Sequence, residues 1–209
     1  MSLTEAASAF VRLARDRTDT RAGADLLASL SGDSLARLFA RFQADPEGRR
    51  ILAERESLPK ALRAHGWLET LPAGSLGRAY LNWIHRHGLT AEYLTRETEG
   101  AFKMPPNPSD ELRWFFEREQ AAHDLWHVIT YNGPDFTGEA RIVWMMWPQH
   151  ENTGVFLPML LSGMFQIRDL PSLIHSNHMA RHATWWPALD WCALLPKPLS
   201  YVRMLAGIE

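Results

Sequence analysis

Apolar residues recur every three or four positions along most of this chain, and this spacing limits the fold more than any other feature. Leu3, Phe10 and Leu13 follow it near the start, and Leu112 and Phe115 follow it in the middle. Such spacing places apolar side chains on one face of an α-helix. No stretch of useful length alternates apolar and polar residues as a β-strand does. The sequence therefore predicts an all-α fold.

Capping residues, prolines and glycines predict where the helices begin and end. Asp33 or Ser34 caps one helix, Asp45-Pro46 opens the next, and Gly88 ends a third. The predicted helices cover residues 3–16, from 34, 45–52, 76–87, from 109 or 110 to 130, from 138, 155–165 and 172–192, with bends at Pro158 and Pro187. We expect a single-domain bundle of seven to nine helices over residues 1–209. A separate small N-terminal helical part, residues 1–73, is the alternative.

Charge and cysteine content exclude several classes of protein. Twenty-two Lys and Arg residues nearly balance 24 Asp and Glu residues, giving a net charge of −2. This balance counts against a nucleic-acid partner, which needs a concentrated basic surface. The single cysteine, Cys192, rules out an internal disulfide framework and a cysteine-ligated zinc site. We expect Cys192 to be a packing residue rather than a nucleophile.

The longest apolar tract, residues 155–165, is interrupted by Pro158, Ser162 and Gly163. It is shorter than the roughly 20 residues that span a bilayer. The N-terminus also lacks the compact apolar core of a secretory signal. We therefore expect a protein of the cytoplasm, as in bacteria. As a separate expectation, it contacts the inner membrane peripherally.

Polar residues occupy the core face of the predicted helix at 109–130. The positions that continue its apolar stripe hold Glu119, His123, His127 and Thr130. Burying such groups without partners costs about 2 to 7 kcal/mol each. They must therefore find partners in the folded protein.

His123 and His127 lie one helical turn apart, so their rings point the same way. Asp124 is close enough in sequence to bind a metal or to orient an imidazole. The turn at 132–134 then returns the chain, so that Glu139 can reach the same point. Two imidazoles and two carboxylates suit a borderline or hard divalent ion. The alternative is a histidine pair that is merely packed or solvated.

The spacing of the histidines and carboxylates also resembles a known family pattern. His123-Asp124-Leu125-Trp126-His127, eleven further residues and Glu139 give the pattern H-D-x-x-H-x(11)-E. This pattern resembles the signature of the coenzyme Q biosynthesis protein family known as Coq four. Residues 45–55, 76–80 and 189–208 resemble further blocks of the same family.

The resemblance implies an all-helical protein of ubiquinone biosynthesis. It implies a divalent metal, usually zinc, at His123, Asp124, His127 and Glu139, and a bound polyprenylated quinone precursor. The implied reaction removes the C1 carboxylate of the precursor's aromatic ring oxidatively and replaces it with hydroxyl. As a mechanistic hypothesis, Glu139 or Asp124 would act as the catalytic base rather than as a metal ligand. The other ubiquinone-biosynthesis proteins would be partners, and we expect the chain to form a homo-oligomer.

The sequence departs from the family pattern after the motif. Thr130 is followed directly by Tyr131 and Asn132, where the family favours Thr-Gly-Tyr, and residues 143–148 replace a Glu-rich helix with aromatic and methionine residues. Residues 143–147 and 155–165 together offer more apolar surface than two helices normally bury. Flexible methionines suit an isoprenoid chain. This predicts an apolar tunnel or a membrane-facing groove, with an ordinary packed core as the alternative.

Two other polar groups need an interpretation. His175, His178 and His182 share a helical face, which we interpret as solvated or hydrogen-bonded, with a second metal site as the alternative. Arg118 is expected near the metal-binding face, where it would pair with Glu119 or with a substrate carboxylate.

Three classes of function remain open. The first is a metal-dependent enzyme acting on a prenylated aromatic acid. The second is a non-catalytic prenyl-lipid-binding scaffold. The third is a His-Asp metal hydrolase, which the neutral charge and the apolar tract disfavour.

Overall fold

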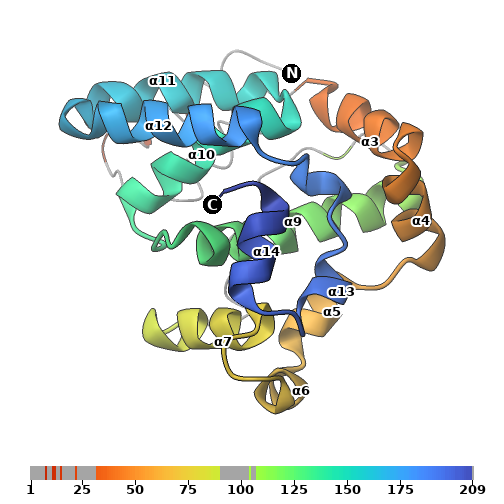
Figure 1. Cartoon of the computed structure of the whole chain (residues 1–209). Helices are drawn as coiled ribbons and strands as arrows, with labels where there is room; N and C mark the ends of the chain where they lie inside the picture. The colour runs from red at the N-terminus through yellow and green to blue at the C-terminus, as the bar shows by residue number, and fades with distance from the viewer. Residues whose placement is uncertain are drawn as a thin grey trace.

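The computed structural model describes residues 32–89 and 107–208, together with a few isolated positions outside these ranges. Within the described ranges the chain forms eleven α-helices and three short 3-10 helices, and it contains no strand (Figure 1). The prediction of an all-α fold is confirmed. The sequence predicted seven to nine helices, and the difference comes from short helices such as α5 (Leu58–Arg63) and α6 (His65–Thr70). The predicted helix at 3–16 lies outside the described ranges.

The first half of the described chain follows its capping signals. Helix α3 spans Ser34–Ala44, and α4 spans Pro46–Glu54. The side chain of Asp45 accepts hydrogen bonds from the backbone N–H groups of Glu47 and Gly48, each at 2.9 Å. Helix α7 spans Leu76–Arg86 and is followed by Gly88 with a φ of 63°. These boundaries match the prediction because caps act locally.

Helix α9 (Asp110–Thr130) crosses the middle of the molecule (Figure 1). It contacts α3, α5, α7, α10 (Phe136–His150) and α14 (Leu199–Ala206). Ser109 caps it by accepting from the N–H of Leu112 at 3.2 Å. Because so many elements surround α9, four of its polar residues are buried: Arg118, Glu119, Asp124 and His127.

Two apolar clusters form the core along α9. The larger one includes Tyr80, Trp126, Trp186 and Trp191, which are at most 1% exposed. The smaller one joins α3 and α4 to the start of α9, and there Phe115 packs against the rings of α3. One cluster therefore packs against the start of α9, and the other packs against its second half.

The upper layer in Figure 1 consists of α10, α11 (Phe156–Phe165) and α12 (Leu170–His182). The predicted single helix at 172–192 is wrong, because α12 ends at His182 and Ala183 is extended. The backbone N–H of Trp186 donates to the side chain of Gln149 at 2.7 Å, which ties the chain to α10. A 3-10 helix at Trp186–Ala188 and the short α13 (Trp191–Leu194) follow. None of the described helices is both long and apolar enough to cross a membrane.

Candidate metal centre

A tight turn joins α9 to α10 and returns the chain toward the end of α9. Tyr131 adopts a left-handed conformation with a φ of 56°, and the N–H of Asn132 donates to the carbonyl of His127 at 3.0 Å. Asp135 then caps α10 by accepting from the N–H groups of Thr137 and Gly138 at 3.0 and 3.1 Å. This cap starts α10 at Phe136, two residues earlier than predicted.

Gly138 allows the turn to be this tight. A Cβ atom built on Gly138 would lie 1.9 Å from the carbonyl oxygen of Gly133. No side chain fits at that distance, so the first turn of α10 approaches Gly133 only with glycine present. The next residue along α10 is Glu139, and the close approach carries its carboxylate to the end of α9.

The turn brings together three of the four predicted ligands. Ligand atoms of His123, His127 and Glu139 all lie within 4.8 Å of one another. Oε1 of Glu139 is 3.3 Å from Nε2 of His127, and Oε2 is 3.6 Å from Nε2 of His123. The two imidazole rings meet edge to face with centroids 4.8 Å apart. Both histidines therefore present Nε2 toward one carboxylate.

His127 is almost completely enclosed. Its side chain is 1% exposed, and neither ring nitrogen has a well-aligned hydrogen-bond partner among the described residues. The ring of Trp83 packs against it with centroids 5.4 Å apart, and the indole N–H of Trp83 donates to the carbonyl of Asn132 at 3.0 Å. The side chains of His123 and Glu139 are 25% and 34% exposed, so the site is open on one side.

The charges of this group reinforce one another. Removal from water opposes ionisation of Glu139, but the charge of His127, its contact with the carboxylate and the charge of His123 outweigh this and lower the pKa of Glu139 to about 2. Burial likewise disfavours a charged His123, but Asp124 and Glu139 together raise the pKa of His123 above its ordinary value. Glu139 therefore stays ionised at neutral pH, which is the state in which a carboxylate binds a metal ion.

Asp124 lies outside this group of three. Its Oδ1 atom is 3.7 Å from Nδ1 of His123, on the side of the ring opposite to Nε2. A carboxylate at that position orients the imidazole and makes its other nitrogen a better ligand. Of the two roles that the sequence allows for Asp124, this geometry favours orientation over ligation.

The residues present fit a divalent metal ion. Nitrogen and oxygen ligands about 2.0 to 2.2 Å from a tetrahedral ion lie about 3.3 to 3.5 Å apart, close to the 3.3 and 3.6 Å that separate Glu139 from the two histidines. The unsatisfied nitrogens of buried His127 supply a further reason for a bound cation. Two histidines and one glutamate form a zinc ligand set that leaves a coordination position open.

Glu119 also finds buried partners, as its position predicts. Its carboxylate accepts from Arg118 at 2.6 Å and lies 3.1 Å from Nε2 of His150. The side chains of all three residues are at most 7% exposed. The pairing of Arg118 with Glu119 is confirmed. His150 and Trp83 were not predicted, because only the tertiary structure brings them to α9.

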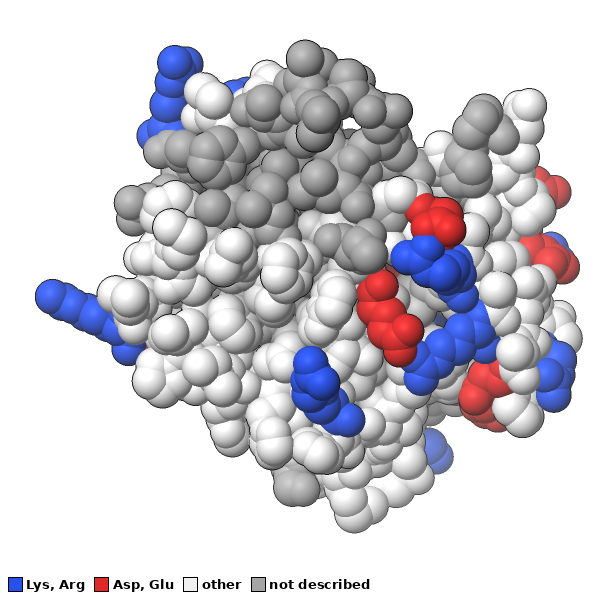
Figure 2. All heavy atoms as spheres, turned by 90° about the horizontal axis from the view of Figure 1, so that it is seen from above, with Lys and Arg blue, Asp and Glu red and all other residues white. Residues whose placement is uncertain are grey.

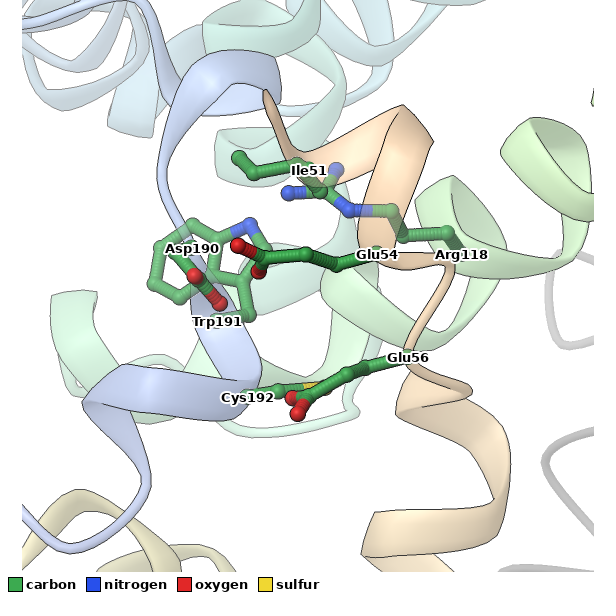
Figure 3. A pocket seen from close by; sticks show the side chains of 7 residues that line it. All are labelled: Ile51, Glu54, Glu56, Arg118, Asp190, Trp191 and Cys192. Carbon is green, nitrogen blue, oxygen red and sulfur yellow. The ribbon is translucent and has the colours of Figure 1, made fainter. Parts of the chain in front are cut away.

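Arg118 also lines a small pocket (Figure 3). Glu54, Glu56, Asp190 and Cys192 line the same pocket. Burial, and then the negative charges of Glu56 and Asp190, raise the pKa of Cys192 to about 12. A thiol in this state is a poor nucleophile, in agreement with a packing role.

The apolar segments after the turn divide into a buried part and an exposed part. Met145 and Met146 of α10 are buried, at 3% and 6% exposure. The outer side of α11 and α12, with the 3-10 turn between them, instead carries exposed apolar side chains: Phe156, Leu160, Met164, Ile167 and Ile174, each at least 50% exposed. Figure 2 views the molecule from the side on which α11 and α12 lie, and charged side chains are sparse over much of that side.

Fold and site together define an all-helical protein with a candidate metal centre of two histidines and one carboxylate. The model of the family described as Coenzyme Q (ubiquinone) biosynthesis protein Coq4 matches residues 2–189. The chain therefore belongs to the Coq4 family.

Curated relatives agree with this assignment. The chain is similar to the mitochondrial ubiquinone biosynthesis protein COQ4 of Coprinopsis cinerea, with 34% identity over 54% of this chain and 37% of the relative. It is 26% identical to that of Aspergillus fumigatus over 89% of this chain and 66% of the relative. The chain thus spans about one third to two thirds of the length of these relatives.

A solved structure shares the fold. The crystal structure of a Nostoc punctiforme protein assigned to ubiquinone biosynthesis superimposes with a TM-score of 0.64. The match covers 99% of this chain and 98% of the other at 17% sequence identity. This similarity supports the helical fold.

Proposed function

We propose that this chain is a divalent-metal-dependent enzyme of ubiquinone biosynthesis that acts on a polyprenylated hydroxybenzoate-type precursor. The reaction removes the C1 carboxylate as carbon dioxide and places a hydroxyl on the same carbon. This change is a two-electron oxidation. We propose water as the source of the hydroxyl oxygen and dioxygen as the oxidant, which takes up the two electrons and leaves as hydrogen peroxide. One observation carries the proposal: His123, His127 and Glu139 converge from two helices on one point, and the buried ring of His127 has no well-aligned hydrogen bond among the described residues.

Zinc is the ion that we propose, held by Nε2 of both histidines and by Glu139. When bound, a divalent ion supplies Lewis acidity for a substrate carboxylate or phenolate oxygen. Trp83 keeps water from one face of His127, and Asp124 holds His123 in orientation. Asp124, which is not a ligand in this arrangement, is the carboxylate that we propose as the acceptor of a proton from the substrate phenol. Glu139 would take this role only where it does not bind the metal.

The exposed apolar side chains of α11 and α12 support a lipid substrate. Phe156, Leu160 and Met164 are spaced four residues apart, so they form a stripe along α11. A polyprenyl tail resides in a bilayer, and a helix with such a stripe can lie in the bilayer surface. We therefore propose peripheral contact with the inner membrane, through which the precursor reaches the metal centre.

The same stripe favours the second candidate, a non-catalytic scaffold that binds prenyl lipid. In that role the metal would be structural, and partner proteins of the pathway would carry out the chemistry. Homo-oligomers and contacts with those proteins are compatible with both functions. The two candidates differ in whether the protein itself releases carbon dioxide.

The test combines metal content with turnover. The full chain and its His127→Ala variant are dialysed against a mild chelator, and metal is counted by elemental analysis. His85→Ala, an exposed histidine of α7, serves as the matched control. We expect about one equivalent in the wild type and in the control. In the variant we expect metal affinity to fall by more than the 10- to 100-fold that loss of an orienting partner costs.

Turnover is then measured with a prenylated hydroxybenzoate labelled at the carboxyl carbon, in vesicles and in air. Release of labelled carbon dioxide by the wild type, but not by His127→Ala or Glu139→Gln, supports the enzyme. Binding of metal and precursor without any release under these conditions supports the scaffold. Absence of metal from the wild type, even after reconstitution, contradicts the proposed metal centre.

A further inference from the structure

A second pair of histidines lies outside the candidate metal centre, on α12. His178 and His182 are one helical turn apart, and both are exposed. Their ring centroids are 4.5 Å apart with an interplanar angle of 60°. The pair on α9 has nearly the same geometry, with 4.8 Å and 70°. The two rings on α12 therefore lie as close together, and at nearly the same angle, as the pair on α9.

We propose that His178 and His182 form a second, solvent-exposed binding site for a borderline divalent transition-metal ion such as Cu²⁺, Ni²⁺ or Zn²⁺. An imidazole ring centre lies about 3 Å from an ion bound at 2.0 to 2.1 Å, so two rings on one tetrahedral ion have centres about 5 Å apart. The observed 4.5 Å needs only a small rotation of two exposed side chains.

The position in the helix favours a cation. His182 is the last residue of α12, and His178 lies one turn earlier. The C-terminal end of a helix carries a partial negative charge, which stabilises a positive charge in its last turn. Arg181, the cationic side chain between them, donates to Asn177 at 3.0 Å and is thus engaged with another residue.

The site has two protein ligands. No third His, Cys, Asp or Glu among the described residues joins this pair in a metal-binding group, and His175 on the same helix stands outside it. Neutral imidazoles without a carboxylate or thiolate select borderline ions over Mg²⁺ or Ca²⁺. Two ligands also leave coordination positions free for water, so binding here is weaker than at the α9 site.

The test is a Cu²⁺ titration of the metal-free full chain, because Cu²⁺ binds most tightly in the divalent series. The variants are His178→Gln/His182→Gln and, as matched control, His175→Gln, which removes an exposed histidine from the same helix. We expect the wild type and the control to bind two equivalents, one tightly and one weakly. In the double variant we expect the weak equivalent to disappear from the titration, because both of its ligands are removed. Electron paramagnetic resonance of that equivalent should show two nitrogen ligands.

A His127→Ala arm separates this inference from the proposed function. That variant should lose the tight equivalent and keep the weak one. Equal binding by the wild type and the double variant, or a weak equivalent that His175→Gln removes equally well, would overturn the α12 site. Loss of both equivalents in His127→Ala would also overturn the α12 site. If the wild type binds only the weak equivalent, that result contradicts the α9 metal centre of the proposed function and leaves the α12 site standing.

Discussion

Helices α9 and α12 each carry two histidines four residues apart, yet they place them in opposite surroundings. The ring geometries are nearly equal, with centroids 4.8 Å apart on α9 and 4.5 Å on α12. His127 of α9 is 1% exposed and shares Glu139 with His123. His178 and His182 are exposed, and they share no carboxylate within the part of the chain that the structure describes. The spacing of four residues thus sets how close the two rings lie. The surroundings of each pair set the affinity for a metal ion that we expect.

Burial explains the difference in expected strength. The core around α9 encloses His127, and its ring nitrogens form no well-aligned hydrogen bond with any described residue. A buried nitrogen without a partner is costly, and a cation bound to it relieves that cost. Around α12 water can satisfy both imidazoles, and an ion must displace that water. The nearby carboxylate of Glu139 and the apolar side chains that enclose His127 therefore make the pair on α9 a far stronger candidate metal site than the pair on α12.

The largest effect short of removing a ligand is expected from Asp124→Asn. The variant removes the negative charge beside Nδ1 of His123, so His123 becomes a weaker and less well oriented ligand. We expect metal affinity at the α9 site to fall about 10- to 100-fold, measured by competition with a chromophoric chelator. Asp110→Asn, an exposed carboxylate at the start of α9, should leave it unchanged. Equal affinities for Asp124→Asn and wild type would contradict the orienting role.

Gly138→Ala should weaken the α9 site through the backbone. The added methyl group would meet the carbonyl of Gly133, and the resulting shift of α10 costs about 1 to 3 kcal/mol of unfolding free energy. Glu139 moves with it, so metal affinity should drop as well. Gly66→Ala, where nothing lies within 4 Å of the new methyl, should be neutral or stabilising. Denaturant unfolding of both variants checks this, and a Gly138→Ala protein as stable as Gly66→Ala would refute the close approach.

The pH dependence of the metal-free protein should single out Glu139. Its lowered pKa means that its contribution to stability is complete above about pH 4.5, the ordinary value, and is lost as the pH falls toward 2. The raised pKa of His123 gives a contribution that is complete below about pH 6.5 and is lost as the pH rises through the raised value. Wild type should therefore exceed Glu139→Gln in stability most clearly between about pH 4.5 and 6.5.

Urea unfolding at pH 3, 5.5 and 8 measures this difference, with the exposed Glu117→Gln on α9 as a control for net charge. A difference between wild type and Glu139→Gln that is constant across these three pH values would contradict the interaction of Glu139 with the histidines.

The smallest effect is expected from the α12 pair. His178→Gln/His182→Gln alters only exposed side chains, so the unfolding free energy of the metal-free protein should stay within about 0.5 kcal/mol of wild type. His127→Gln, at a buried position against Trp83, should cost more. Thermal unfolding of the two variants side by side measures this contrast. Equal destabilisation would mean that α12 is packed more tightly than its exposure indicates.

Local signals predicted much of the fold and most of the site. Asp45, Ser109 and Gly88 mark helix ends because a cap needs only neighbours in sequence. The same signals missed the end of α12, where Gln149 from another helix holds the backbone of Trp186. No local pattern reports a hydrogen bond between residues so far apart in the chain.

For the site, the sequence by itself determined that His123 and His127 point the same way and that a turn separates them from Glu139. Helical periodicity sets the direction of a side chain relative to its own axis, and it does so equally for His178 and His182. Only the tertiary structure decided that α9 is enclosed while α12 is exposed, that Gly138 brings Glu139 within 3.3 Å of His127, and that His150 meets Glu119. Burial and electrostatic contact depend on which helices pack together, and periodicity carries no information about that choice.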